Sequence, residues 1–311
     1  MIQSFSNRIV QNIQKVFIGK EDTTLLLIVA VLCEGHILLE DVPGTGKTTL
    51  ARALAASLGC SFHRMQFTPD LLPSDITGLS WFNQKTQEFE FRPGPVMSQV
   101  VLADEINRAT PRTQSALLEA MQERQVTSDG ITRPLPRPFL VLATQNPIEL
   151  EGTFPLPEAQ IDRFLLRVNI GYPDQQEENQ ILERFHLEDP FMELKPVISI
   201  EEILEVQNAC RKIRVEESLR DYIVRIARAT RHHSEIQLGA SPRATLALYK
   251  CAQAYAAIHG RDYVLPDDVK FIANPVLCHR LIISTQSELR GRTAEELIAD
   301  IVSAVPVPVE T

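Results

Sequence analysis

A glycine-rich loop carries the residues best suited to chemistry: Pro43-Gly44-Thr45-Gly46-Lys47-Thr48, followed by Thr49. Backbone N–H groups in such a turn, at the start of a helix, bind phosphate oxygens, and glycine permits the close approach. Lys47 would reach the β- and γ-phosphates of a nucleotide, and the Thr48 hydroxyl would hold Mg²⁺. The pattern G-x-x-x-x-G-K-[ST] fails at one position, because Asp41 stands where its first glycine belongs. The remaining G-x-G-K-T still predicts a nucleotide site.

Two carboxylates, Asp104 and Glu105, follow the apolar run 100–103. Ligands of open parallel sheets bind at the carboxyl ends of the strands. At that edge Asp104 can orient Mg²⁺ through water, and Glu105 can polarise an attacking water. Asn146 ends the next apolar run, and its amide would hold that water near the γ-phosphate. An Asx turn before Pro147 is the alternative interpretation of Asn146.

Short apolar runs alternate with helical stretches through the first half of the chain. The expected strands are 37–40, 62–67, 100–103, 139–143 and 164–170, and the expected helices are 1–17, 21–33, 47–58 and 111–124. Such alternation predicts an α/β fold, in which helices cover both faces of a parallel sheet. The loop then lies between the first strand and the helix that follows it, as in P-loop NTPases.

Two hairpins are expected to interrupt this pattern. The first, at about 79–95, pairs 80–82 with 88–91 and contains Trp81 and Phe82. The second, at 126–138, turns at 128–130. Aromatic residues are enriched in interfaces, so the first hairpin is the candidate for partner contact or pore lining. Packing of Trp81 and Phe82 on the domain's own core is the alternative.

Strand signals fade after 171–173, and helical stretches follow. These are 176–184, 200–212, 217–232, 242–259 and 266–277. We therefore expect a nucleotide-binding α/β domain at residues 1–185 and a smaller, all-helical lid domain at 186–311, with a hinge near 190–196.

The composition excludes several classes of protein. The 311 residues hold 31 Lys and Arg against 40 Asp and Glu, a formal net charge of −9, which disfavours a generally basic nucleic-acid binder. The five cysteines show no C-x-x-C spacing and are expected to be reduced and buried. No apolar run reaches the ~18 residues of a membrane span. Residues 1–20 lack the apolar core of a signal peptide, so a cytoplasmic protein is expected.

Six motifs in order resemble the MoxR family of AAA+ ATPases. They are 40–48, 66–78, 104–109, 114–121, 158–164 and 239–244, so the resemblance spans nearly the whole chain. It implies an AAA+ core followed by a helical lid, with ATP and Mg²⁺ as cofactors. It also implies a homo-oligomer, a hexameric ring with ATP bound between subunits. Asp41 is compatible with this family, which commonly tolerates a residue other than glycine there.

The resemblance also implies residue roles. Lys47 and Thr48 would bind phosphate and Mg²⁺, Asp104 would bind Mg²⁺, Glu105 would activate water, and Asn146 would sense the γ-phosphate. Arg163, in Asp162-Arg163-Phe164, would be an arginine finger that stabilises transition-state charge in the neighbouring subunit. A surface ion pair with Asp162 is the alternative for Arg163, and the rival interfacial arginines are Arg108, Arg112 and Arg167.

Two further assignments follow from the resemblance. Arg243 opens a predicted helix after Ser241-Pro242 and resembles the second sensor, which contacts the γ-phosphate from the lid. Ile18 and Gly19 match the segment that holds adenine through backbone contacts in such proteins.

The resemblance suggests a chaperone-like remodeller that matures a client protein complex, with metalloenzymes among the targets. A protein with a von Willebrand factor A domain would be its partner. A chelatase motor subunit that drives metal insertion, a nucleic-acid motor and a scaffold that binds ATP without turnover are the alternatives. Intact Glu105 and Arg163 argue against the scaffold, and the net charge argues against the nucleic-acid motor.

Overall fold

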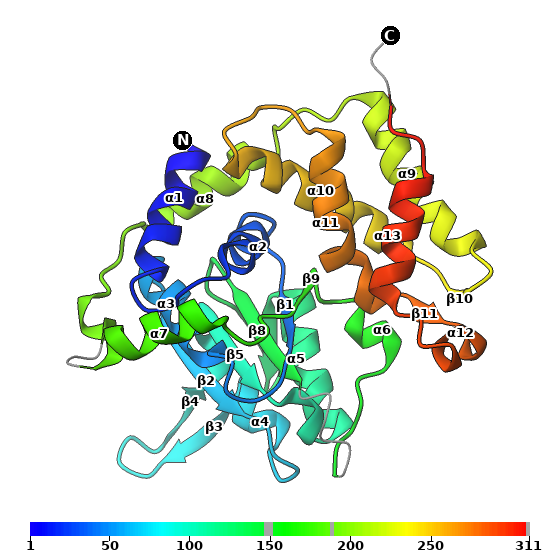
Figure 1. Cartoon of the computed structure of the whole chain (residues 1–311). Coiled ribbons are helices and arrows are strands. Elements are labelled where there is room, and N and C mark those ends of the chain that lie inside the picture. The colour runs from blue at the N-terminus through cyan, green and yellow to red at the C-terminus, as the bar shows by residue number, and fades with distance from the viewer. Residues whose placement is uncertain (146–151, 187–189, 309–311) are drawn as a thin grey trace.

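The computed structural model describes residues 1–145, 152–186 and 190–308. Five parallel strands form its central sheet in the order β2-β5-β8-β1-β9 (Figure 1). Their bounds are β1 Ile37–Glu40, β2 Phe62–Gln66, β5 Val100–Asp104, β8 Leu140–Gln145 and β9 Leu166–Val168. The predicted parallel sheet is confirmed, and its fifth strand is shorter than expected.

Helices cover both faces of this sheet, as the continuous apolar runs predict. Leu39 and Leu102 pack into one core with the helices before and after β1, whereas Leu38 and Val101 pack into a second core with the helix after β5. The helices before and after β1 are α1 Ile2–Ile13, α2 Glu21–Leu32 and α3 Lys47–Ser57, and the helix after β5 is α5 Pro111–Glu123. Short turns of helix lie at α4 Pro73–Thr77, η1 Pro95–Met97, η2 Ile106–Arg108 and α6 Glu158–Ile161.

Both predicted hairpins are present. They pair β3 Gly78–Asn83 with β4 Glu88–Pro93, and β6 Gln125–Ser128 with β7 Ile131–Pro134. The Arg133 guanidinium carbon lies 3.8 Å from the centroid of the Phe91 ring, which joins the second hairpin to the first. Trp81 is 45% exposed and Phe89 is 75% exposed, so these two side chains are not buried in the core of the domain.

Beyond β9, the described residues form helices and one short strand pair. Its helices are α7 Gln175–Phe185, η3 Pro190–Glu193, α8 Ile200–Cys210, α9 Glu217–His232, α10 Pro242–Ile258, α11 Pro266–Leu277, η4 Cys278–Arg280, α12 Thr285–Leu289 and α13 Ala294–Ala304. The strands β10 Ile236–Leu238 and β11 Ile282–Ile283 correct the expectation of an all-helical lid. These strands are too short to give a periodic signal in the sequence.

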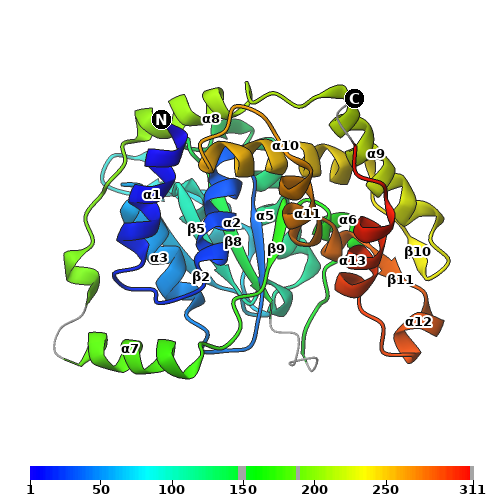
Figure 2. The same cartoon turned by 45° about the horizontal axis from the view of Figure 1, so that its top comes forward.

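The helix α8 packs on the N-terminal helices (Figures 1 and 2). Gln207 Nε2 donates to the carbonyl oxygen of Val31 at 2.7 Å, and Asn12 Nδ2 donates to the carbonyl oxygen of Lys195 at 3.0 Å. One apolar core therefore continues from α1 and α2 into α8 and α10. The domain boundary at 185/186 stays a prediction. Among the described helices, none is both long and apolar enough to cross a membrane.

Three arginines converge on Glu34, in the turn between α2 and β1. Arg124 donates to the Glu34 carboxylate at 2.8 Å and to its carbonyl oxygen at 2.7 Å, and Arg137 and Arg211 also donate to the carboxylate. Burial raises the pKa of Glu34, but the hydrogen bonds from Arg137 and Arg124 outweigh it and lower the pKa to about 2. The charged carboxylate thus joins the ends of α2, α5 and α8.

Glu34→Gln should lower the free energy of unfolding at pH 7 by about 1–3 kcal/mol, because the guanidinium groups lose their charged acceptor. The pKa is lower in the folded state than its ordinary value of 4.5, so the contribution is complete above pH 4.5 and is lost as the pH falls toward 2. Urea unfolding of both proteins from pH 7 to pH 3 measures this difference, which should shrink below about pH 4.5.

Glu216→Gln is the control, because it removes an exposed ion pair with Arg214. It should change the unfolding free energy by less than about 0.5 kcal/mol. A difference between wild type and Glu34→Gln that stays constant down to pH 3 would contradict the electrostatic assignment.

Candidate nucleotide-binding site

The glycine-rich loop closes around the N-terminus of α3. Gly44 and Gly46 have φ angles of +87° and +86°, which favour glycine, and Gly46 caps the helix. A cavity of about 380 Å³ lies against the loop. It is lined by Pro43, Gly44, Gly46, Lys47, Thr48, Thr49, Arg64, Asp104, Glu105 and Thr144. The structure therefore brings the residues predicted to bind phosphate and the two acidic residues to one cavity, which we call the phosphate cavity.

The Lys47 ammonium is held within the loop. Its Nζ donates to the carbonyl oxygens of Asp41 at 2.8 Å and Val42 at 3.2 Å. The positive charge therefore lies beside the loop N–H groups and the positive end of the α3 dipole, a combination that suits a polyphosphate.

The Asp41 carboxylate has a structural task. Its Oδ2 accepts from the backbone N–H of Ile170 at 2.9 Å and of Gly171 at 2.8 Å, and its Oδ1 accepts from Val42 N–H at 2.9 Å. Asp41 is buried, and these bonds tie the start of the loop to the segment after β9. The departure from the glycine pattern thus supplies an acceptor that glycine lacks.

Asp104 and Glu105 lie at the carboxyl end of β5 and share one partner. The Thr144 hydroxyl on β8 donates to Asp104 Oδ1 at 2.6 Å and accepts from Glu105 N–H at 2.8 Å. Glu105 has a φ angle of +55°, a conformation that costs energy for a residue with a side chain and that this N–H bond helps to hold. The two carboxylates are therefore fixed by neighbouring strands.

Side chains from β2 complete this acidic edge. Arg64 donates to Asp104 Oδ2 from Nε at 3.1 Å and from Nη2 at 2.6 Å, and Gln66 Nε2 donates to Glu105 Oε2 at 2.7 Å. Sequence reasoning missed Arg64, Gln66 and Thr144. Two polar residues separated by one position at the end of a predicted strand are the signal that could have found Arg64 and Gln66, since such residues share a face.

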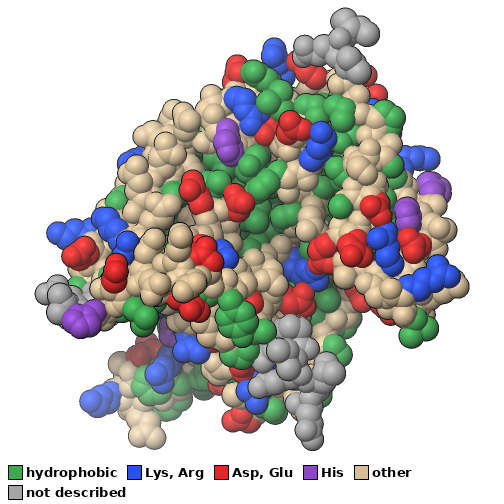
Figure 3. Space-filling view, viewed as in Figure 1, with side chains coloured by type: hydrophobic (Ala, Val, Ile, Leu, Met, Phe, Trp, Pro, Cys, Tyr) green, Lys and Arg blue, Asp and Glu red, His purple; other side chains and the backbone are tan. Residues whose placement is uncertain are grey.

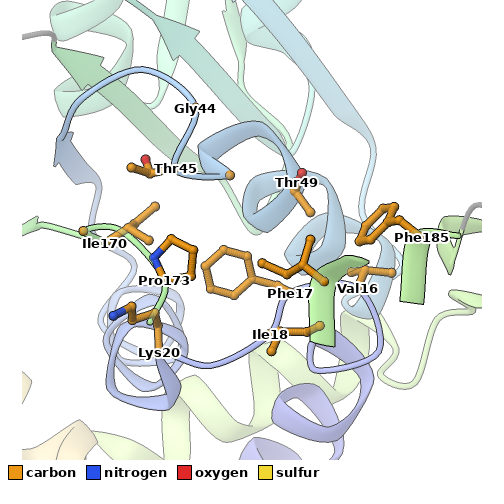
Figure 4. A pocket seen from close by; sticks show the side chains of 13 residues that line it. Val16, Phe17, Ile18, Lys20, Gly44, Thr45, Thr49, Ile170, Pro173 and Phe185 are labelled. Atoms are coloured by element: carbon orange, nitrogen blue, oxygen red, sulfur yellow. The ribbon is translucent and has the colours of Figure 1, made fainter. Parts of the chain in front are cut away.

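A second, smaller pocket of about 180 Å³ adjoins the loop. Figure 4 shows Phe17, Ile18, Ile170 and Pro173 on its walls, with Thr45 of the loop and Thr49 of α3 facing them. Its apolar lining next to a phosphate-binding loop fits a flat aromatic base. Ile18 lines this pocket, whereas Gly19 does not, and contact of either residue with adenine stays a prediction. A Cβ on Gly19 would lie 1.9 Å from Glu177 Oε1 of α7, so glycine there permits the close approach of that helix.

The remaining predicted residues lie elsewhere. Neither Arg163 nor Arg243 lines the phosphate cavity. Arg163 follows Asp162 directly, and Arg243 Nη1 lies 3.7 Å from Asp162 Oδ2. The lid also binds Asp162 through Arg280 Nε at 2.9 Å. The structure thus separates these two arginines from the loop of their own chain, and Asn146 lies outside the described residues.

The rival arginines differ in their contacts. Arg167 donates to Glu40 at 2.9 Å and also pairs with Glu295, which ties β9 to β1 and to the lid. Arg108 donates to Glu105 of its own chain at 2.9 Å. Arg112 is exposed in the first turn of α5. Arg112 is therefore the rival that remains most available to another subunit.

Asp41→Gly restores the strict glycine pattern, yet it should lower the free energy of unfolding by about 1–3 kcal/mol, because three backbone N–H groups lose their acceptor. Asp41→Asn keeps one acceptor oxygen and should cost less. Urea unfolding monitored by circular dichroism measures both variants. A stabilising effect of Asp41→Gly would show that the carboxylate is not needed to hold the loop.

Comparison with known proteins agrees with this geometry. Residues 36–166 match the ATPase family associated with various cellular activities (AAA), and residues 228–301 match the AAA lid domain. The chain is 52% identical to the uncharacterized protein YeaC of Bacillus subtilis, covering 97% of this chain and 94% of that protein. It is 41% identical to chaperone MoxR1 of Mycobacterium tuberculosis, covering 97% and 82%. Protein MoxR of Methylorubrum extorquens is 30% identical, with coverage of 97% and 94%.

A solved structure supports the same assignment for the whole chain. A Cytophaga hutchinsonii protein, described as a candidate ATPase, is 40% identical with a TM-score of 0.93, covering 99% of this chain and 96% of that one. The predicted family, the α/β core with its helical lid and the ATPase class are thereby confirmed. The chain belongs to the MoxR-type AAA ATPases.

Proposed function

We propose that this ATPase works as a homo-oligomeric ring, hexameric as in the sequence-based prediction, that remodels a client protein complex in a chaperone-like manner. The observation that carries the proposal is the separation of the site into two groups. The loop and both carboxylates line one cavity, whereas Arg163 and Arg243 lie beside Asp162 and outside that cavity. A second subunit would supply the missing cations.

The residues of the phosphate cavity fit a Mg²⁺–ATP complex. The Thr48 hydroxyl and the Asp104 carboxylate are oxygen ligands of the kind that Mg²⁺ prefers, and the apolar pocket beside Ile18 suits adenine. Mg²⁺ would neutralise charge on the β- and γ-phosphate oxygens. Lys47 and the loop N–H groups would bind those oxygens. Glu105, held by Gln66 and Arg108, would orient and polarise the attacking water.

Arg163 is proposed as the finger that acts on the neighbouring subunit. Its side chain is partly exposed and, among the described residues, has no hydrogen bond or ion pair within the chain. A guanidinium supplied by another subunit makes hydrolysis depend on assembly. Arg243, which shares the Asp162 region, is proposed to contact the same phosphate group from the lid.

A protein partner fits the surface better than a nucleic acid does. The β3–β4 hairpin presents Trp81, Phe82 and Phe89 as exposed large hydrophobic residues. Basic and acidic side chains are mixed over α12 and α13 on the face shown in Figure 3, where Arg292 pairs with Glu296 and Asp300. The M. tuberculosis relative is named a chaperone. We propose a von Willebrand factor A domain protein as partner, with a metalloenzyme complex as client.

Steady-state ATP hydrolysis measured against protein concentration tests the ring. Specific activity should rise with concentration, because each site needs a second subunit. Arg163→Ala should lower kcat by about 10³-fold or more while remaining folded. Glu105→Gln should also abolish turnover. Arg112→Ala tests the rival arginine: it should keep its activity, and a loss as large as that of Arg163→Ala would contradict the assignment of the finger to Arg163.

An experiment that mixes two inactive variants decides whether the site is shared between subunits. Lys47→Ala retains Arg163 but lacks its own phosphate site, and Arg163→Ala has the reverse defect. Mixed rings should recover activity at interfaces where an intact site meets an intact Arg163. Activity that is independent of concentration, together with a normal Arg163→Ala variant, would overturn the shared site.

Trp81→Ala should leave basal ATPase activity within about twofold, because the side chain is exposed on the hairpin and outside the nucleotide cavity. It should weaken the change in ATPase rate that a bound partner protein causes, since exposed aromatic residues contribute much of the energy of interfaces. Ile131→Ala, at an exposed position on the other hairpin, is the control. Combined loss of folding and basal activity would contradict this role.

A further inference from the structure

Asp104, the carboxylate proposed to bind Mg²⁺, already forms an ion pair with Arg64. Arg64 donates to Asp104 Oδ2 through Nε at 3.1 Å and through Nη2 at 2.6 Å. Thr144 occupies Oδ1. Both oxygens of Asp104 therefore have donors, and one donor is a guanidinium that lines the phosphate cavity. A divalent cation at Asp104 must compete with Arg64 for the same oxygen.

The two partners differ in freedom to move. The Arg64 side chain is 49% exposed on the edge strand β2, whereas the Asp104 side chain is 14% exposed at the end of the interior strand β5. Exposed ion pairs of arginine contribute little free energy, so the guanidinium can leave at small cost. Asp104 stays in place, because Thr144 also holds it.

Arg64 is also linked to the water-activating carboxylate. Its Nη2 donates to Gln66 Oε1 at 3.2 Å, and Gln66 Nε2 donates to Glu105 Oε2 at 2.7 Å. The side chains of Asp104, Arg64, Gln66 and Glu105 therefore form one continuous chain of hydrogen bonds. Moving the guanidinium removes a contact on the Gln66 amide that holds Glu105.

We propose that Arg64 is a positioning residue that occupies Asp104 until Mg²⁺–ATP displaces it, and that its departure is passed to Glu105 through Gln66. This inference rests on the proposed Mg²⁺–ATP site. Arg64 neutralises Asp104 when the metal is absent. The exchange releases the guanidinium toward the cavity and lets Gln66 and Glu105 readjust, so that metal arrival sets the position of the catalytic carboxylate.

The test is the binding of a fluorescent, non-hydrolysable ATP analogue, titrated with buffered free Mg²⁺. Arg64→Met removes the competing charge and keeps much of the side-chain length. The free Mg²⁺ concentration at half-saturation should fall by about two- to fivefold, as expected for loss of an exposed pair. Arg64→Lys, which keeps the charge without the planar fork, should give a smaller shift.

Two further variants separate competition from general charge effects. Arg108→Met removes an equal charge that contacts Glu105 rather than Asp104, so it should shift the Mg²⁺ midpoint less than Arg64→Met does. Gln66→Ala should leave the midpoint unchanged but lower kcat at saturating Mg²⁺. Arg64→Met should also lower kcat, so its metal affinity and its turnover move in opposite directions. A merely structural ion pair would not produce this split.

The results distinguish a failure of this inference from a failure of the proposed function. An unchanged or higher Mg²⁺ midpoint in Arg64→Met, with normal Mg²⁺-dependent binding in wild type, overturns the inference and leaves the proposed function intact. Equal shifts in Arg64→Met and Arg108→Met also overturn it. Wild type that binds the analogue at no Mg²⁺ concentration overturns both the inference and the proposed function. Unfolding midpoints of all variants should match, since both arginines are half-exposed.

Discussion

The site depends on one constraint, the common carboxyl edge of strands β2, β5, β8 and β1. Parallel pairing in register brings Gln66 opposite Asp104 and Ala103 opposite Ala143. The polar residue that follows or ends each strand therefore meets its neighbours without a long loop to position it. The Thr144 hydroxyl holds both acidic residues at this edge, because it donates to Asp104 and accepts from the Glu105 backbone N–H. The glycine-rich loop needs its own anchor, which is the Asp41 carboxylate.

The lid is joined to this edge by ion pairs from β9 and from the segment before it. Arg167 joins β9 to Glu40 at the end of β1 and to Glu295 of α13. Asp162, before β9, accepts from Arg280, whose side chain is 2% exposed. Removing one partner of a buried ion pair costs much free energy, so the pair between Asp162 and Arg280 resists separation. Core and lid are thus coupled near the start of the nucleotide loop and beside Arg163.

The sequence predicted the parallel sheet, both hairpins and the placing of the glycine-rich loop between a strand and a helix, because each depends on patterns within a few residues. It could not predict contacts between residues far apart in the chain. Arg64 and Asp104 are 40 positions apart, and only the strand order places them together. Asp41 was explained as tolerated, while its partners Ile170 and Gly171 lie 129 and 130 positions away. The helix α13 was missed although the sequence signals it, because the capping box of Thr293 and Glu296 stands directly before the apolar residues Leu297, Ile298 and Ile301.

The contact between Arg133 and Phe91 has a consequence for the path from the surface to the site. It links the two hairpins, and β7 leads through residues 135–139 into β8. Because β8 lies between β5 and β1, it is paired on both sides. Its carboxyl end carries Thr144, which contacts Asp104 and the Glu105 backbone. The exposed aromatic hairpin and the two carboxylates are therefore connected through Arg133 and one interior strand.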